Sequence, residues 1–598
     1  MPKTTAVVWD ISELFAGPDD PRVDQCLDAL LARARQFAKA YRNKIDNKNL
    51  NAETFLAAIR NYEDIVRQIA RISSCAALLF ASDTSKPERG AFMQRIQKRE
   101  TDISLELMFF GLELMAAKPE IIDPLARDEA LKDYRHFIHA SRLFRDHRLS
   151  ESEEKLLEEK ANTGSRAFER LFEEMVSAIE FKITLDGKEK TLTEAEVLAL
   201  LRDPSREVRQ AAAASFTEGL RKNGRLLTYI FNTLVFDKAV DDRLRRYQYP
   251  DQSRNIANEL DGKTVETVIS TCSRNYPLVA RYYRTKRKIL GLDTLMHYDR
   301  HAPLFEAKRE YSFEEARGII LESFGGFSKD MSDIAAEFFD GHWIDAQPRK
   351  GKRGGAFCEY VTPDHHPYIM LSYLNGRDDV IALAHELGHG VHACLSRHQT
   401  YLNFRGVLPI AELASTFGEM LVFEALVDQA ELEEKLVLYA GKIEGIFVTA
   451  FRQAALFQFE QELHSARRQR GELTCDEIGA MWQSTTQAMF GDSVIMGPGH
   501  ENWWMNIDLF LNSPFYVYAY PFGALVVMAL YSMYRREGKS FVPRYMELLR
   551  TGGSCSPREM LRGIGIDIND RDFWSSGMKL IEELVDRFEK LHSEWEVR

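Results

Sequence analysis

The sequence contains few cysteines. Its 598 residues include seven, and these are scattered singly, without a Cys-x-x-Cys pair. An odd number of dispersed thiols argues against a disulfide framework and against a cysteine-rich zinc site. Reduced thiols in the cytoplasm agree better with this pattern, so we expect a cytoplasmic protein.

The sequence also lacks a long uninterrupted apolar run. Residues 1–17 (MPKTTAVVWDISELFAG) carry acidic side chains where a signal peptide has an apolar core. The strongest candidate for a membrane span, residues 514–534, is interrupted by Pro521 and contains five tyrosines. Its apolar part is shorter than the roughly 20 residues that a spanning helix needs. We therefore expect a buried helix there and no membrane partner.

Positive charge is not in excess, because the formal net charge is −12. A protein of this sign repels the phosphate backbone, so we expect no nucleic-acid partner. The chain is long enough for a large core in two lobes. A helical pattern restarts near residues 195–205, which favours a division into 1–198 and 199–598. The sequence does not decide between a monomer and a homo-oligomer.

Strand-like sequence is scarce, and helical periodicity rich in Leu, Ala, Glu, Arg and Lys dominates. We therefore expect a mainly α fold. Ser150 is a suitable N-cap for a helix in the charged stretch 149–175. Two places favour strands. Residues 172–193 contain an Asp-Gly turn between FKITL and KTLT, and residues 356–373 contain two extended runs around a turn.

The stretch 381–394 (IALAHELGHGVHAC) carries three histidines in an otherwise apolar run. Asp378 or Asp379 is a suitable N-cap for a helix that runs to about Leu395. One side of this helix forms an apolar stripe of Val380, Leu383, Ala384, Leu387, Val391 and Leu395. The three histidines lie on the opposite side, away from the face that packs.

The pattern His385-Glu386-x-x-His389 has a chemical meaning. Histidines four residues apart lie on one helical face and can bind one metal ion, while the adjacent glutamate reaches a water molecule. Zinc lowers the pKa of that water, and the carboxylate removes its proton as it attacks a carbonyl. The glycines at 388 and 390 cost about 1 kcal/mol each inside a helix, so another element should approach closely there. A solvated polar face that happens to carry histidines remains an alternative.

A catalytic zinc site needs a third protein ligand. His392 is a poor candidate, because its Cα lies about 4.5 Å further along the helix axis than that of His389. Glu412 is a better one. It lies on a second expected helix that begins near Pro409 and carries Glu412, Ser415, Thr416 and Glu419 on one polar face. Glu419 could orient a ligand histidine from behind. The alternative is a solvent-facing capping segment.

A carboxylate-bridged di-iron protein is a different possibility, because such sites use paired Glu-x-x-His motifs on facing helices. Glu386-x-x-His389 qualifies, and so does Glu589-x-x-His592. The second motif lies in a highly charged final helix that is typical of a solvated surface. The sequence therefore favours one zinc ion per chain over two iron ions.

Several separated stretches resemble the oligoendopeptidase F branch of the thimet-oligopeptidase-like zinc peptidases. The resemblance covers nearly the whole chain and is far more specific than the histidine motif alone. It rests on WDISELF (9–15), HRLSESEEKLL (147–157), GKRGGAFC (351–358), PYIMLSY (367–373), DDVIALAHELGHGVH (378–392), AELASTFGEML (411–421), GHENWW (499–504) and NSPFYVYAYPFG (512–523).

The resemblance implies a mainly helical, two-lobed zincin-type metallopeptidase with a deep central channel and a small β-sheet near the active site. It also implies an oligoendopeptidase F N-terminal domain at about 110–185 and a catalytic domain at 199–598. Such an enzyme hydrolyses internal bonds of short peptides. His385, His389 and Glu412 would bind zinc, and Glu386 would be the general base.

The resemblance also implies roles for residues outside the metal site. Gly354, Gly355 and Ala356 match the substrate-binding edge, where bare backbone adds a peptide as an extra strand. Tyr516 and Tyr520, four residues apart, would donate hydrogen bonds to the oxyanion that forms during hydrolysis.

The sequence departs from the family at two positions. The family usually has IPHF where this chain has IDLF, so Leu509 replaces a histidine that donates a hydrogen bond near the transition state. His500 is a candidate replacement that would contact the substrate. Pro521, directly after Tyr520, is expected to kink the helix there. An alternative function is therefore a zinc-retaining peptide-binding protein with weak or altered amide hydrolase activity.

Overall fold

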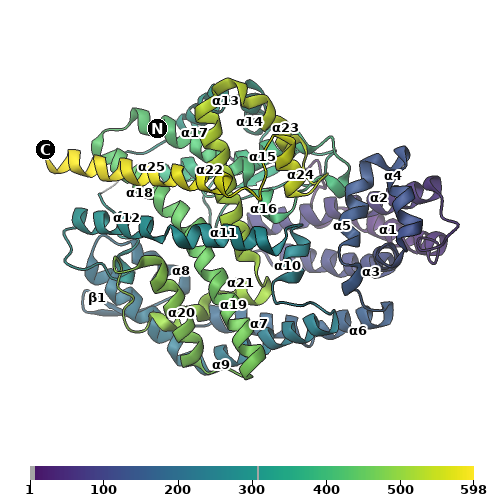
Figure 1. Cartoon of the computed structure of the whole chain (residues 1–598), viewed down its shortest axis with the longest axis horizontal. Coiled ribbons are helices and arrows are strands. Elements are labelled where there is room, and N and C mark those ends of the chain that lie inside the picture. Colours follow the sequence, from purple (N-terminus) through teal and green to yellow (C-terminus); the bar gives the residue numbers. More distant parts are fainter. Residues whose placement is uncertain (1–6, 306–308) are drawn as a thin grey trace. The chain divides into compact units, whose positions relative to one another are not determined.

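The structure is a computed structural model that describes residues 7–305 and 309–598. Helices dominate it, which confirms the predicted mainly α class (Figure 1). The chain forms two compact units, each assembled from three separate segments. The first unit comprises Met1–Arg148, Lys308–Asp428 and Met533–Asp567, and the second comprises Leu149–Ala307, Gln429–Ser532 and Ile568–Arg598. The division at 198/199 is a different, sequence-based one, and it stays a prediction.

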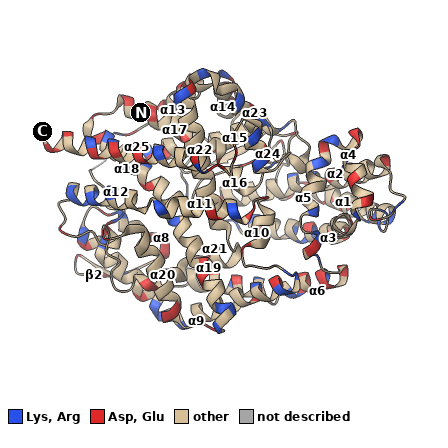
Figure 2. Ribbon diagram, in the orientation of Figure 1, with Lys and Arg blue, Asp and Glu red and all other residues tan. Residues whose placement is uncertain are grey.

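Basic and acidic residues are interspersed along the helices of each unit (Figure 2). Two helices are long and apolar enough to cross a membrane, judged by length and composition alone: Ala52–Ser82 and Tyr516–Ser540. In the second of these, 72% of the apolar window is buried within the protein, as in the core helix of a folded domain.

The first unit begins with three long helices that pack against one another (Figure 1). Asp20 and Asn51 cap two of them by accepting hydrogen bonds from backbone N–H groups of the first turn. The helices of this unit are α1 (Pro21–Tyr41), α2 (Ala52–Ser82), α3 (Pro87–Ala116), α4 (Pro119–Arg127), α5 (Arg135–Arg142), α13 (Phe313–Phe327), α14 (Lys329–Asp340), α15 (Arg377–Ser396), α16 (Leu408–Ala411), α17 (Leu413–Gln429), α23 (Val542–Arg550) and α24 (Pro557–Gly563).

A small sheet of three strands accompanies these helices, in the order β3 (Ile344–Asp345), β5 (Tyr368–Met370) and β4 (Phe357–Glu359). β5 pairs in parallel with β3 and antiparallel with β4. β4 and β5 confirm the two extended runs predicted in 356–373. β4 lies at an edge of the sheet, and α15 packs against β4 and β5.

A buried ion cluster fixes the chain that leads into β4. The side chain of Asp345 is completely buried, and it accepts hydrogen bonds from Lys352 Nζ at 2.8 Å and from Arg349 at 2.7 Å. Lys352 also donates to the carbonyl of Leu371 at 2.6 Å. A buried carboxylate needs such partners, because desolvation otherwise disfavours its charge. The exposed residues 354–356 therefore follow a rigid anchor.

The histidine-bearing helix α15 starts differently from the sequence-based expectation. Its N-cap is Gly376, whereas Asp378 and Asp379 lie in the first turn. The Asp379 carboxylate accepts hydrogen bonds from the backbone N–H of Gly376 at 2.8 Å and of Leu374 at 2.9 Å. The expectation of an aspartate N-cap was wrong because this carboxylate caps from the third helical position, as in a capping box.

α15 and α17 approach each other without space for a side chain at Gly388. A Cβ atom there would lie 2.5 Å from the Cα of Ser415 and 2.6 Å from the carbonyl oxygen of Ala414. At Gly390 a Cβ atom would lie 2.4 Å from the ring of Phe338. These contacts confirm that another element approaches the glycines closely.

The second unit contains the predicted hairpin, formed by β1 (Phe181–Leu185) and β2 (Lys188–Leu192). Asp186 and Gly187 have φ angles of 52° and 72°, which suit a two-residue turn of type I′. Ser150 caps its helix through a capping box with Glu153, as predicted. The helices of this unit are α6 (Glu151–Ala161), α7 (Ser165–Ser177), α8 (Glu194–Ala199), α9 (Arg206–Leu244), α10 (Gln252–Ala257), α11 (Gly262–Arg274), α12 (Tyr276–Ile289), α18 (Leu432–Ile446), α19 (Gln453–Arg470), α20 (Cys475–Phe490), α21 (Leu509–Asn512), α22 (Ala519–Glu537, whose end belongs to the first unit) and α25 (Arg571–Glu596).

The contact at Gly388 predicts the outcome of adding one methyl group. We expect Gly388→Ala to lower the free energy of unfolding by about 1–3 kcal/mol, because backbone atoms of α17 cannot move aside without separating the helices. Gly445→Ala is the matched control, since this exposed helical glycine has no atom within 4 Å of an added Cβ. It should be neutral or stabilising by about 0.5–1 kcal/mol. Urea denaturation followed by circular dichroism measures both, and equal effects would contradict the packing argument.

Candidate metal centre

Three side chains from two segments of the first unit converge at one point. The Nε2 atoms of His385 and His389 are 3.2 Å apart, and Glu412 Oε2 lies 3.2 Å from the first and 3.3 Å from the second. Ligand atoms 2.0–2.2 Å from a tetrahedral zinc ion are about 3.3 Å from one another. The triangle therefore has the size that one such ion requires.

Glu412 reaches the histidines because the chain is not one continuous helix at this point. It lies between α16 and α17 with φ −87° and ψ 5°. The hydroxyl of Ser415 donates to Glu412 Oε2 at 2.8 Å, which holds the carboxylate in place. Burial alone would raise the pKa of Glu412, but the two histidines hold this pKa well below its usual range.

Glu419 fixes the ring of His385 on the side opposite the triangle. Its Nδ1 lies 2.5 Å from Glu419 Oε1, so the N–H at Nδ1 donates to this carboxylate and Nε2 remains directed at the triangle. Burial alone would lower the pKa of His385, but Glu412 and Glu419 raise this pKa well above its usual value. The two histidines are partly buried and converge, so they do not form a solvated polar face.

Glu386 is a buried carboxylate next to the triangle in sequence. It is 6% exposed, and its Oε2 has no hydrogen-bond partner. Burial raises its pKa above the ordinary value for glutamate, although the nearby histidines oppose this shift. An unpartnered oxygen of raised basicity is suited to accept a proton.

His392 differs from the sequence-based expectation. We expected it on the side away from packing, but it is 4% exposed, and burial lowers its pKa to about 4. It does not belong to the group of candidate metal ligands formed by the triangle. Its rejection as third ligand agrees with the structure, although its exposure was predicted wrongly.

The rival Glu-x-x-His motif is not arranged for a metal. Glu589 Oε2 accepts a hydrogen bond from Arg281 at 2.6 Å, and His592 stacks on Trp595. Among the residues that the structure describes, no candidate metal group contains either of them. This arrangement argues against a di-iron site.

The predicted substrate edge lies in the same unit. Gly354, Gly355 and Ala356 are exposed and lead directly into β4, which pairs with β5 alone among the strands described. Gly355 has a φ of +82°, a conformation that favours glycine.

The tyrosine segment belongs to the second unit. The rings of Tyr516 and Tyr520 lie 5.3 Å apart and are partly exposed, whereas Tyr518 is buried and accepts a hydrogen bond from Asn258 at 2.9 Å. Pro521 occupies the first turn of α22, where no intrahelical donor is needed, so it does not interrupt the helix. The helix continues past this position to Glu537, and the expected kink stays a prediction.

Glu460 and Arg254, which the sequence analysis overlooked, hold the loop before these tyrosines. Glu460 accepts a hydrogen bond from the backbone N–H of Phe515 at 2.7 Å, and Arg254 donates to the carbonyl of Pro514 at 3.2 Å. Phe515 adopts a φ of +60°, which costs energy for a non-glycine residue. A glutamate within the aromatic run LFQFE was the available signal.

His500 does not lie where a substrate-binding residue should. Its exposed fraction is 1%, and its ring packs against Trp503. Its Nδ1 lies 3.3 Å from Gln483 Oε1. A side chain so enclosed cannot touch a peptide, so the structure disagrees with this expectation. Leu509 is partly buried at the start of α21.

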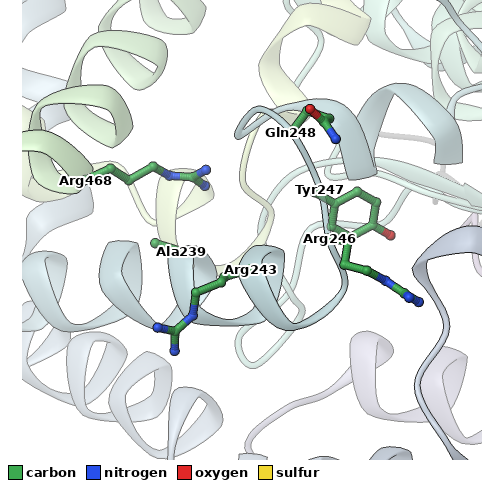
Figure 3. Close-up of a pocket in the computed structure, with 6 residues that line it drawn as sticks. All are labelled: Ala239, Arg243, Arg246, Tyr247, Gln248 and Arg468. Atoms are coloured by element: carbon green, nitrogen blue, oxygen red, sulfur yellow. The ribbon is translucent and has the colours of Figure 1, made fainter.

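A pocket of about 480 Å³ lies in the second unit, lined by Ala239, Arg243, Arg246, Tyr247, Gln248 and Arg468 (Figure 3). The guanidinium of Arg468 pairs with the buried carboxylate of Asp242. The neighbouring Arg245 pairs with Glu154 at 2.8 Å. Of the three arginines that line the pocket, Arg468 thus has an acidic partner.

Comparisons with known proteins agree with this geometry. The model of "Peptidase family M3" matches residues 199–580, and the model of "Oligopeptidase F" matches residues 113–181. The chain belongs to peptidase family M3. As an M3 peptidase it is a metallopeptidase, a hydrolase that acts on oligopeptides.

Relatives of this M3 peptidase match over almost its full length. It is 27% identical to oligopeptidase PepF of Bacillus subtilis, over 98% of this chain and 87% of the relative. It is 24% identical to an oligoendopeptidase F homolog of Borreliella burgdorferi, over 94% of each chain.

Solved structures share the fold. A Chlamydophila abortus protein aligns with a TM-score of 0.84 at 23% identity, over 98% of each chain. Oligoendopeptidase-F from Enterococcus faecium aligns with a TM-score of 0.73 at 20% identity, over 96% of this chain and 100% of that chain.

The contact behind His385 predicts a loss of metal affinity. We expect Glu419→Gln to weaken zinc binding by about 10–100-fold, because a neutral amide orients and polarises the imidazole less well than a carboxylate. Glu424→Gln, an exposed position on the same helix, is the matched control and should bind zinc like the unaltered protein. Competition with a chromophoric chelator measures both affinities. An unchanged affinity in Glu419→Gln would show that this contact does not support the metal site.

Proposed function

We propose that this M3 peptidase is a zinc-dependent endopeptidase that hydrolyses internal peptide bonds of short oligopeptides. The observation that carries the proposal is the triangle of two imidazole nitrogens and one carboxylate oxygen, with sides of 3.2–3.3 Å. Two neutral nitrogens and one anionic oxygen are a donor set suited to zinc, and they leave a position open for catalysis.

His385, His389 and Glu412 would hold the ion, one per chain. When bound there, zinc polarises a peptide carbonyl and makes a water molecule more acidic. Glu419 keeps the proton of His385 on Nδ1, so that Nε2 stays available as a ligand. Ser415 holds Glu412 in place through a hydrogen bond from its hydroxyl group to the carboxylate.

Glu386 is proposed as the general base and then the general acid. Its unpartnered oxygen accepts a proton from the attacking water and later gives that proton to the leaving amine. Its burial supports this role, because a raised pKa brings the carboxyl group closer to the working pH.

The edge strand β4 and the exposed residues Gly354, Gly355 and Ala356 are proposed to bind the peptide backbone. An extended peptide could pair with the free edge of the sheet, as in β-augmentation. Main-chain pairing is insensitive to side chains, so it suits an enzyme that accepts many sequences.

Tyr516 and Tyr520 are proposed as hydrogen-bond donors to the oxyanion. The support is their match to the family motif, their partial exposure and the pairing of their rings. The loss of one such donor costs about 10²–10³ in turnover in other hydrolases.

An alternative function is a zinc-retaining peptide-binding protein with weak or altered hydrolysis. Leu509, in place of the family's usual histidine, is its support. The intact Glu386 weighs against it. A cytoplasmic location, the absence of nucleic-acid and membrane partners, and the division into domains 1–198 and 199–598 remain proposals from the sequence.

The decisive experiment compares the protein with Glu386→Gln on a mixed peptide library. We expect internal cleavage of short peptides by the unaltered protein and a loss of about 10²–10⁴ in kcat/KM in the variant, because the base is absent. Mass spectrometry maps the products, with and without a chelator. Zinc content should be equal in both proteins.

Two other outcomes would redirect the assignment. Peptide binding without chelator-sensitive cleavage by the unaltered protein would favour the peptide-binding alternative. Cleavage that is retained in Glu386→Gln would remove Glu386 from the mechanism.

The tyrosine assignment makes a separate prediction. We expect Tyr516→Phe or Tyr520→Phe to lower kcat by up to about 10²–10³ with little change in KM, because the hydroxyl acts in the transition state. Tyr518→Phe is the control, since its buried hydroxyl bonds to Asn258 and should affect stability by about 1 kcal/mol. Steady-state kinetics distinguishes the variants, and equal kcat values for all three would contradict the assignment.

A further inference from the structure

A second group of potential metal ligands lies in the first unit, and it shares no residue with the triangle of His385, His389 and Glu412. Glu13 belongs to the segment before α1, and His365 and His366 belong to the loop between β4 and β5. Their ligand atoms all lie within 4.8 Å of one another. Glu13 Oε2 is 3.3 Å from Nε2 of His366 and 3.7 Å from Nε2 of His365.

The other ring nitrogens determine the tautomers. Nδ1 of His365 lies 3.1 Å from the carbonyl of His366, and Nδ1 of His366 lies 3.1 Å from the carbonyl of Pro367. A carbonyl oxygen can only accept, so each Nδ1 carries the hydrogen and each neutral ring has its lone pair on Nε2. Two lone pairs and a carboxylate thus face one another with no donor among them.

A proton on one ring does not resolve this arrangement. The side chains of the two histidines are only 5% and 11% exposed, so little water can solvate a charged ring. A single imidazolium at His366 would satisfy Glu13 but not His365, whose Nε2 is buried without a hydrogen-bond partner. A cation between the three atoms satisfies all of them.

The two rings are held in place before any ion binds. His366 stacks on Trp343 with the ring centroids 4.0 Å apart and the planes 8° from parallel. Tyr368 contacts both histidine rings, at 4.5 Å and 5.8 Å between centroids. Glu13 is exposed and can adjust its side chain. The separations of 3.3 and 3.7 Å are close to the roughly 3.3 Å between ligand atoms of a tetrahedral zinc ion.

We propose that Glu13, His365 and His366 form a second binding site for a divalent transition-metal ion such as Zn²⁺ or Co²⁺. Water completes the coordination, because three protein ligands leave a position open. The ion joins the segment before α1 to the loop between β4 and β5. The ion therefore has a structural role, in which it stabilises the sheet that carries the edge strand β4.

The test isolates this site in a His389→Ala background, where the peptidase triangle is broken. After removal of metal with a chelator, the protein is titrated with Zn²⁺, and bound metal is measured by mass spectrometry after desalting. We expect two zinc ions in the unaltered protein, one in His389→Ala, and none in His389→Ala combined with Glu13→Gln or His365→Asn. The affinity of this site for zinc should fall at least about 10-fold in each double variant. The loss of a supporting contact alone already causes a decrease of that size, and here a ligand itself is removed.

A second readout separates binding from misfolding. Zn²⁺ should raise the melting temperature of His389→Ala but not that of the double variants, because only a metal that binds the folded state stabilises it. His389→Ala with Glu53→Gln, an exposed glutamate, is the matched control and should keep both the ion and the shift. A single zinc ion in the unaltered protein, or a second ion that survives Glu13→Gln and His365→Asn, overturns the proposal.

Discussion

The close approach of α15 and α17 at Gly388 is the constraint on which the candidate metal centre depends. The backbone of Ser415 fills the space that a side chain at 388 would occupy. This contact places the residues just before α17 beside the histidine face of α15. Glu412 can then lie 3.2–3.3 Å from both imidazoles, although 23 positions separate it from His389 in the chain. Backbone packing thus sets the geometry of the ligands.

This arrangement removes several charged groups partly from water, and most of them have a partner of opposite charge or a hydrogen-bond donor. Glu412 is held by two histidines and Ser415, and His385 is held from behind by Glu419. Glu386 is the exception, because one of its oxygens has no hydrogen-bond partner. A buried carboxylate of this kind is costly for the stability of the fold, and it agrees with the proton-transfer role proposed for Glu386.

Local patterns in the sequence were sufficient for much of the fold and for singling out His385, His389 and Glu412, whose side chains converge in the structure. The four-residue spacing of His385 and His389 fixes a shared helical face, and the polar pattern that includes Glu419 indicated the partner helix α17. Glu412 was expected on that helix, but it lies at the break between α16 and α17. The Asp-Gly dipeptide identified the hairpin, because it favours a two-residue turn between strands. Each of these signals depends on residues close together in the chain, whose geometry is set by regular helices and turns.

Features that depend on tertiary contacts were missed. The two-residue strand β3 has no pattern of its own and exists because β5 pairs with it. His500 was expected at the substrate, but the rings of Trp482, Trp503 and the distant His297 enclose it. His365 and His366 form a cluster only because Glu13, about 350 positions earlier, folds against them. Helical periodicity does not reveal contacts between residues that are distant in the chain.

The interleaving of segments has a consequence for synthesis of the chain. The first unit takes its last segment, Met533–Asp567, from near the C-terminus, whereas its first helices emerge from the ribosome at the beginning. The hydroxyl of Tyr545, in that last segment, donates to the carbonyl of Leu413 directly after Glu412. The residues around Glu412 therefore gain this contact only after Tyr545 has been synthesised, and a product that ends before Asp567 contains neither unit complete.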